Sequence, residues 1–253
     1  MIPVDELKTK ALASFSLSRI LWATLATGGR LIKEFALDTP ADDPKIRADV
    51  QNWARKLCRA MNVRITLRGA PLDTTPGLLV GNHMSYIDVP VLLALEPMGF
   101  VAKAEVQKMP VIGPAAEGFG VIFIERNSDK SRKSTSESLT KAILENNRRV
   151  VVFPEGTTSL KGLPWRAGVF KLAQEQKIPM QAMAISYQPA DKASFQISSM
   201  LDHAMELPDA GPIEAYVTFS EPFFVTDFLK DFEKWEKWSK DIVSADLARQ
   251  GIA

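Results

Sequence analysis

Short apolar runs alternate with helix-like segments along most of the chain, and this alternation is its main structural signal. Runs typical of buried strands occupy residues 63–68, 78–80, 100–102, 118–126, 150–154, 180–186 and 216–219. Helical patterns occupy residues 46–61, 87–95, 128–147 and 166–176, and a further amphipathic helix is expected within 226–253. Strands and helices in this succession predict an α/β body.

The N-terminal stretch follows a different pattern. Residues 11–37 are rich in apolar side chains, but Arg19, Arg30 and Lys33 interrupt them. The uncharged runs are shorter than the ~20 residues that a bilayer-spanning helix needs. We therefore expect helices that lie in the membrane interface, with a break at Gly28-Gly29, and the alternative is an ordinary amphipathic helix packed on the core.

The segment Asp38-Thr39-Pro40-Ala41-Asp42-Asp43-Pro44 is polar and carries two prolines, which marks it as a boundary. The sequence thus predicts an N-terminal unit of membrane-interface helices over residues 1–43 and a main domain over residues 44–253.

Composition narrows the classes of function. The chain has 253 residues, 46% of them hydrophobic, which suffices for a substantial core. Its 31 Lys and Arg residues balance 30 Asp and Glu residues, so we do not expect a protein that wraps nucleic acid by neutralising phosphates. A single cysteine, Cys58, rules out an internal disulfide and a cysteine-based zinc site and fits a reducing cytosol, and with only two histidines we expect no metal.

The strongest candidate for chemistry is the pair His83 and Asp88, which lies where the 78–80 strand turns into the 87–95 helix. A neutral imidazole accepts a hydroxyl proton near pH 7 if a partner fixes its tautomer, and Asp88 is the expected partner. A purely structural interpretation competes with this one, because Ser85-x-x-Asp88 also has the spacing of a helix capping box.

Two further polar groups follow apolar strands. Arg126 ends the 118–126 run and suits an anionic head group, although an ion pair with Glu125 is the alternative. The loop Glu155-Gly156-Thr157-Thr158-Ser159 follows the 150–154 strand, and open α/β sheets bind ligands at such ends. Gly118-x-Gly120 lacks the third glycine and the preceding strand of a dinucleotide fingerprint, so no nucleotide cofactor is expected.

The order of these blocks resembles the glycerolipid O-acyltransferases typified by 1-acylglycerol-3-phosphate acyltransferases. The resemblance covers roughly residues 75–190 and rests on three blocks: Asn82-His83-x-Ser85-x-x-Asp88, then Gly120-x-x-Phe123-x-Glu125-Arg126, then Phe153-Pro154-Glu155-Gly156-Thr157. It implies a mixed sheet flanked by helices, with residues 44–253 as the catalytic domain and the N-terminal helices at the cytoplasmic face of the inner membrane.

The resemblance also implies roles for individual residues. His83 would deprotonate an acceptor hydroxyl that attacks the thioester of acyl-CoA or acyl-carrier protein, while Asp88 orients the imidazole; no other cofactor is implied. Backbone N–H groups near the following helix start are expected to stabilise the oxyanion. By family position, Arg126, Glu155, Gly156 and Thr157 would hold the polar part of a lysolipid acceptor.

One departure bears on the acceptor. Phosphatidate-forming relatives usually have an arginine after Glu-Gly-Thr, where this chain has Thr158, whose hydroxyl is one neutral donor instead of a bidentate fork. The Thr-Thr form is similar to that of relatives that acylate lyso-aminolipids such as lyso-ornithine lipids. The sequence therefore favours a lyso-aminolipid acceptor slightly over lysophosphatidate, with Thr158 in the acceptor site.

Two other classes of protein remain as alternatives. A serine hydrolase would use Ser85 beside His83, but the chain has no Gly-x-Ser-x-Gly elbow. A non-enzymatic lipid-binding protein would use the N-terminal helices, yet it would not need His83, Asp88 and Glu155 together.

Overall fold

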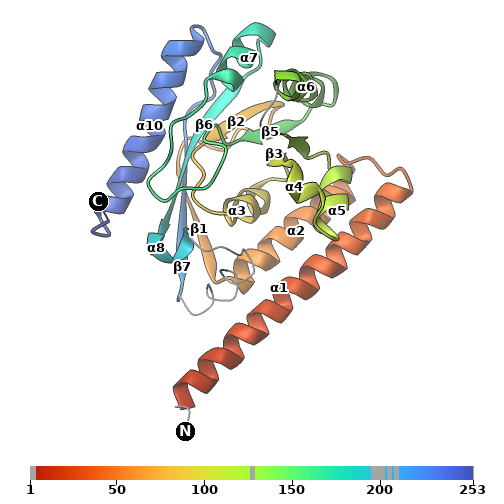
Figure 1. Ribbon diagram of the computed structural model, residues 1–253, viewed down its shortest axis with the longest axis vertical. Helices are drawn as coiled ribbons and strands as arrows, with labels where there is room; N and C mark the ends of the chain where they lie inside the picture. Colours follow the sequence, from red (N-terminus) through yellow and green to blue (C-terminus); the bar gives the residue numbers. More distant parts are fainter. Residues whose placement is uncertain (1–3, 126–128, 195–202, 204–206, 208–210, 253) are drawn as a thin grey trace.

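The chain is built around a seven-stranded mixed sheet of order β1-β7-β6-β2-β5-β3-β4 (Figure 1). The computed structural model describes residues 4–125, 129–194, 203, 207 and 211–252, with side chains from residue 18 in the first helix and from residue 133 in the sixth. The strands are β1 (Val63–Gly69), β2 (Gly77–Gly81), β3 (Gly99–Lys103), β4 (Ile122–Ile124), β5 (Arg149–Val152), β6 (Met180–Gln188) and β7 (Ile213–Phe219). The α/β body and the mixed sheet expected from the sequence are thus confirmed.

Five neighbouring strands, from β6 to β4, run parallel, while β7 is antiparallel to β6 and β1 is parallel to β7. The described helices are α1 (Val4–Ala36), α2 (Pro44–Ala60), α3 (Asp88–Leu95), α4 (Ala104–Gln107), α5 (Ile112–Gly118), α6 (Asp129–Thr140), the π-helix η1 (Lys141–Glu145), α7 (Gly168–Gln176), α8 (Ala190–Ala193) and α10 (Phe228–Ala248). They cover both faces of the sheet (Figure 1).

The central strands are buried on both faces, so alternate residues supply two separate cores. Leu79 of β2 faces the core that α2 and α3 cover, whereas its neighbours Leu78 and Val80 face the core that η1 and α7 cover. All five residues of β2 are buried. This explains why the central strands read as continuous apolar runs, because in parallel sheets both faces are packed.

Strand register determines which loops meet. β2 and β5 pair in parallel with Val80 opposite Val152, so the segments that follow them leave the sheet at the same edge. Residues 82–88 and residues 153–159 are therefore neighbours, although about 70 residues separate them in the chain.

The Asn82 side chain continues the pairing of β2 with β6 by bonding to the backbone of Ile185. Its amide donates to the Ile185 carbonyl and its Oδ1 accepts from the Ile185 N–H, both at 2.8 Å. Ser239 of α10 also donates to Oδ1, at 3.4 Å. Because Asn82 is buried and precedes His83, these bonds fix where the functional turn begins.

The N-terminal segment forms one continuous helix. The expected break at Gly28-Gly29 is absent, and both glycines lie inside α1. Gly28 instead allows close packing, since a Cβ there would lie 2.4 Å from Cγ1 of Val111. The ring of Phe35 approaches Gly118 of α5 as closely, at 2.1 Å from the position of a Cβ. The C-terminal half of α1 thus packs on α2 and α5, and its N-terminal half extends beyond the body (Figure 1).

The outward side of α1 remains apolar. Leu21, Trp22 and Leu25 are 46%, 73% and 57% exposed. Among the described helices, none combines the length and the hydropathy required to cross a bilayer.

Two elements differ from the sequence prediction: one strand is shorter, and one helix is divided. The strand expected over residues 118–126 is limited to Ile122–Ile124, because Phe119 N–H still bonds to the Ala115 carbonyl and Gly120, at a φ of 81°, turns the chain out of α5. The helix expected over residues 128–147 is divided into α6 and the π-turn η1.

Candidate active site

His83 and Asp88 form a direct hydrogen bond beyond the carboxyl end of β2. Nδ1 of His83 lies 2.7 Å from Oδ2 of Asp88. A carboxylate only accepts, so Nδ1 carries the proton and Nε2 is left with its lone pair. The His83 side chain is 18% exposed and the Asp88 side chain is fully buried. In the described part of the chain, Nε2 has no hydrogen-bond partner.

The buried Asp88 carboxylate accepts hydrogen bonds from four donors of the protein, which take the place of water. Oδ2 accepts from His83 and from the N–H groups of Met84 at 2.9 Å and Ser85 at 3.1 Å. Oδ1 accepts from the Tyr187 hydroxyl at 2.5 Å. These bonds compensate for burying an ionised carboxylate. The bond from the Ser85 N–H is one half of the expected capping box, but the other half is absent, because the N-cap of α3 is Ile87 and no side chain caps the helix. Asp88 thus serves the turn and His83 together.

The start of α3 offers fewer free donors than expected. The N–H groups of Met84 and Ser85 are taken by Asp88, and that of Ile87 points to Ser85 Oγ at 3.4 Å. The Asp88 N–H bonds to the Ser85 carbonyl at 3.1 Å. These four N–H groups already have partners, so an oxyanion would have to be bound by other backbone donors, and its stabilisation near the helix start stays a prediction.

The loop after β5 lies against His83. The rings of His83 and Phe153 are stacked, with centroids 4.0 Å apart and an interplanar angle of 8°. The N–H of Ser159 donates to the His83 carbonyl at 2.8 Å. Contact at two points holds the imidazole between its carboxylate partner and this loop.

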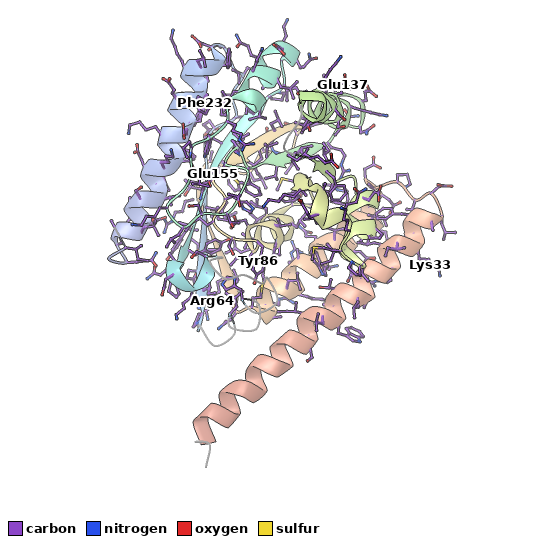
Figure 2. The ribbon with its side chains drawn as sticks, in the orientation of Figure 1. Lys33, Arg64, Tyr86, Glu137, Glu155 and Phe232 are labelled. Atoms are coloured by element: carbon purple, nitrogen blue, oxygen red, sulfur yellow. The ribbon has the colours of Figure 1, made fainter. Side chains whose placement is uncertain are left out.

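Glu155 is a second buried carboxyl, with an environment opposite to that of Asp88. It lies near the centre of the body and is 5% exposed (Figure 2). Among the described residues, neither of its oxygens has a hydrogen-bond partner. Burial raises the pKa of Glu155 to about 8, although the N–H groups of His83, Leu163 and the Trp165 indole face the carboxyl and lower its pKa.

Of the remaining predicted acceptor residues, three lie in the loop that contains Glu155 and one lies outside the described residues. Gly156, Thr157 and Thr158 follow Glu155 in the same half-buried loop, and Gly156 has a φ of 76°, which glycine adopts without strain. The described residues make no hydrogen bond with the Thr157 or Thr158 side chains. Arg126 lies outside the described residues.

Sequence reasoning assigned no role to Tyr187 and Phe153. Tyr187 is 99 residues from Asp88, just past the end of the strand expected at 180–186, so no local pattern marks it. Phe153 directly follows β5 and belongs to the apolar run expected as a strand at 150–154, where an aromatic residue is typical of the core. Within the described chain, no group of three or more His, Cys, Asp or Glu residues is arranged to hold a metal ion.

Comparison with known proteins places this geometry in a family. The model of the family described as Acyltransferase matches residues 63–186. The lyso-ornithine lipid O-acyltransferase of Brucella abortus is 30% identical over 203 residues, which cover 69% of this chain and 75% of the relative. The chain belongs to the Acyltransferase family.

Other relatives in the Acyltransferase family carry two different names. The lyso-ornithine lipid O-acyltransferase of Pseudomonas aeruginosa is 38% identical over 140 residues, 53% of this chain and 52% of the relative. The 1-acyl-sn-glycerol-3-phosphate acyltransferase of Neisseria meningitidis is 32% identical over 154 residues, 60% of each chain. The chain thus spans about half to three fifths of these two relatives.

The acyltransferase fold extends over almost the whole chain. The crystal structure of the 1-acyl-sn-glycerophosphate acyltransferase PlsC from Thermotoga maritima matches with a TM-score of 0.71 over 95% of this chain and 96% of that one, at 18% identity. The first and third sequence blocks of this family member meet where His83 stacks on Phe153. The second block ends at Arg126, which lies outside the described residues.

The raised pKa of Glu155 makes stability depend on pH. Its pKa rises from an ordinary 4.5 to about 8 on folding, so folding takes up a proton between these values. The stability that a protonated Glu155 provides is complete below pH ~4.5 and is lost as the pH rises through about 8. One pKa unit corresponds to about 1.4 kcal/mol, so we expect the unfolding free energy to fall by a few kcal/mol over this range.

The neutral Glu155→Gln should lose less of its unfolding free energy over the same range, which urea unfolding at pH 5 to 9 measures. Glu145→Gln, at an exposed position, is the matched control and should follow the wild type. Equal pH slopes for wild type and Glu155→Gln would contradict the burial argument.

Proposed function

We propose that the protein is a membrane-associated O-acyltransferase that moves a fatty acyl group from an acyl thioester to the free hydroxyl of a lysolipid. The observation that carries the proposal is the Nε2 of His83, which no described residue bonds: the ring is held by the 2.7 Å contact of Nδ1 with Asp88 and lies beside the loop that contains Glu155. Family membership supports acyl transfer as the reaction.

The reaction follows from the tautomer of His83. Nε2 accepts the proton of the acceptor hydroxyl as its oxygen attacks the thioester carbonyl, and the imidazolium is stabilised by the Asp88 carboxylate. Collapse of the tetrahedral intermediate breaks the carbon–sulfur bond, and His83 returns the proton to the departing thiolate. The ester forms directly, so no acyl-enzyme and no cofactor are required. Acyl-CoA and acyl-carrier protein both present such a thioester, and either serves as donor in this scheme.

The Glu155 carboxyl is suited to the polar part of the acceptor. Within the described part of the chain its two buried oxygens have no hydrogen-bond partner, and a substrate hydroxyl or ammonium group would relieve that cost. Gly156, Thr157 and Thr158 would line the same part of the site, and Arg126 would complete it by family position.

We propose a lyso-aminolipid of the ornithine-lipid type as the preferred acceptor. Thr158 brings no positive charge to the position after Gly156-Thr157, so a phosphomonoester lacks a bidentate partner there. The names of the Pseudomonas and Brucella relatives support this choice. The name of the Neisseria relative supports the alternative, 1-acylglycerol-3-phosphate as acceptor and phosphatidate as product.

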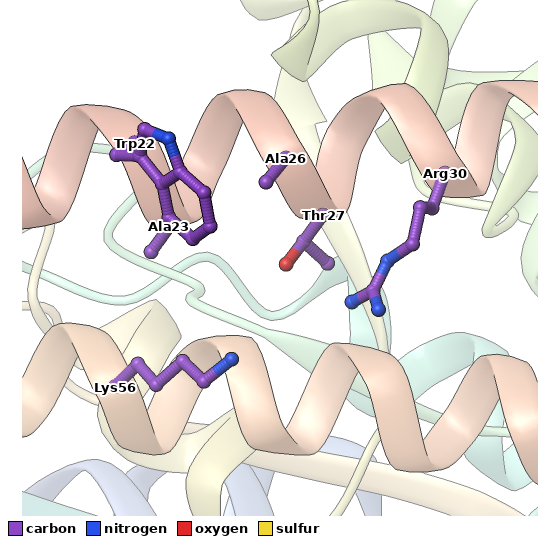
Figure 3. Close-up of a pocket in the computed structure, with 6 residues that line it drawn as sticks. All are labelled: Trp22, Ala23, Ala26, Thr27, Arg30 and Lys56. Carbon is purple, nitrogen blue, oxygen red and sulfur yellow. The ribbon is translucent and has the colours of Figure 1, made fainter.

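The acceptor lies in a membrane, and we propose that α1 holds the enzyme at the cytoplasmic surface of that membrane. Leu21, Trp22 and Leu25 present apolar side chains to the outside. Beside them, Trp22, Arg30 and Lys56 line a groove of about 380 Å³ between α1 and α2 (Figure 3). Apolar side chains next to cations are typical of helices that bind anionic lipid surfaces.

The first test combines the base with the acceptor. Purified protein is incubated with acyl-CoA or acyl-carrier protein and a panel of lysolipids, and the products are identified by mass. His83→Ala should lower the rate of transfer by about 10²–10⁴-fold with unchanged melting temperature, as the loss of a general base does. Ser85→Ala should retain transfer, because the mechanism does not use its hydroxyl.

Loss of transfer in Ser85→Ala with the fold intact would favour a serine nucleophile. Absence of thioester turnover with every donor and acceptor would leave only a lipid-binding role.

Thr158→Arg tests the acceptor head group. A well-placed charged fork is worth ~1.5–3 kcal/mol, so kcat/KM for lysophosphatidate relative to lyso-ornithine lipid should rise roughly tenfold to a hundredfold. Thr158→Val, which adds no charge, should leave the preference unchanged. A wild-type preference for lysophosphatidate of more than tenfold over every aminolipid would reject the aminolipid proposal.

The exposed apolar side of α1 can be tested with vesicles that contain anionic phospholipid. Leu25→Asp should reduce co-sedimentation of the full chain at least several-fold, because a charge at the interface opposes insertion. Leu67→Asp on β1 is the control, since Leu67 is 53% exposed against 57% for Leu25. Equal effects of the two substitutions would show that α1 is not the membrane contact.

A further inference from the structure

We propose that Tyr187 is a positioning residue for the His83–Asp88 pair: its hydroxyl fixes the Asp88 carboxylate in the one rotation that presents Oδ2 to the imidazole. The kinetic part of this inference rests on the proposed acyl transfer, and its spectroscopic part does not.

The two oxygens of Asp88 have unequal partners. Oδ2 accepts from the His83 ring and from two backbone N–H groups, whereas Tyr187 is the one described donor to Oδ1. Without it, Oδ1 would be a fully buried carboxylate oxygen with no donor. The carboxylate would then gain by rotating to share the donors of the turn between both oxygens, which misdirects the bond to Nδ1 while the negative charge stays beside the imidazole.

Tyr187 is itself held rigidly. It lies in β6 and pairs with Ala215 in the ladder with β7, and its carbonyl accepts from the Gln250 amide at 2.8 Å. Its side chain is fully buried. Tyr187, a donor anchored to the sheet, therefore fixes the rotation of the Asp88 carboxylate. The backbone of the turn alone would leave that rotation undefined.

The hydroxyl remains a donor at every pH at which the enzyme works, because burial and the nearby Asp88 charge raise the pKa of Tyr187 well above its usual value. A short bond to an ionised acceptor draws negative charge toward the phenol. Without it, the full carboxylate charge acts on His83, and the imidazolium persists to higher pH.

Other titratable groups face this pair from the neighbouring elements. Glu155 lies in the loop after β5, and its carboxyl senses the Asp88 charge. Cys58 of α2 faces Tyr187, and burial raises the pKa of its thiol to about 12, so it is neutral. Neither side chain is substituted in Tyr187→Phe, so the lost hydroxyl is the change to which a shifted His83 titration is traced.

The experiment compares Tyr187→Phe with Tyr216→Phe, which removes an exposed hydroxyl from β7. Tyr187→Phe should lower kcat by about five- to fiftyfold and leave KM within about twofold, because the base is misaligned while substrate contacts remain. The acidic limb of its pH profile should move upward by roughly 0.5–1 pH unit. Tyr216→Phe should match the wild type in all three respects.

A second readout requires no activity. The chain has two histidines, so the imidazole resonances of His83 are identified by their absence in His83→Gln. Their titration midpoint should move upward in Tyr187→Phe and stay in place in Tyr216→Phe. Replacing all three tyrosines by 3-fluorotyrosine makes the hydroxyl a stronger donor and should move the midpoint downward, which keeps the test valid if Tyr187→Phe does not fold.

Coupling separates positioning from packing. In an Asp88→Asn background, Tyr187→Phe should lower kcat by less than about twofold, because the carboxylate it positions is gone. A full additional loss there, or a lower melting temperature with an unchanged pH profile and unchanged His83 titration, would overturn the proposal. If the wild type transfers no acyl group but the His83 midpoint moves as expected, the proposed function fails and the positioning role stands.

Discussion

The buried carboxylate of Asp88 is the constraint on which the site depends. An ionised group excluded from water is tolerated only if donors surround it, and Asp88 obtains them from His83, from the adjacent turn and from Tyr187. These donors converge only if β2 lies beside β6 in its observed register. Asn82, bonded to Ile185 at both ends of its amide, holds that register where the turn begins.

Glu155 shows how environment gives a second carboxyl a different character. Each oxygen of Asp88 accepts a hydrogen bond, whereas among the described residues neither oxygen of Glu155 accepts one within hydrogen-bonding geometry, although three N–H groups face its carboxyl. Burial raises the pKa of Glu155 to about 8. Two acidic side chains at one edge of the sheet are thus suited to different tasks. In the proposed mechanism the first stabilises an imidazolium, and the second presents a largely neutral polar group to the acceptor.

Close packing joins the helix α1, for which we propose a membrane-binding role, to the body that carries this site. Gly28 admits Val111, and Gly118 admits Phe35, so the helix lies directly on α5 and cannot pivot freely at its glycines. Its exposed leucines and Trp22 then occupy a fixed position relative to the sheet. Any surface that α1 binds is presented with the catalytic edge in a defined orientation.

The sequence alone determined the order and type of most elements, because apolar runs with period 2 or 3.6 reflect which faces are buried. It also identified His83 with Asp88 and the loop at Glu155, since strand-ending polar residues carry a local signal. It overestimated the 118–126 strand, where the helical cap of α5 competes for the same residues, and it placed a break where Gly28 serves packing. Only the tertiary structure brought Phe153 onto His83 and Tyr187 onto Asp88. Those contacts join residues up to 99 positions apart, and they depend on strand register, which no short stretch of sequence encodes.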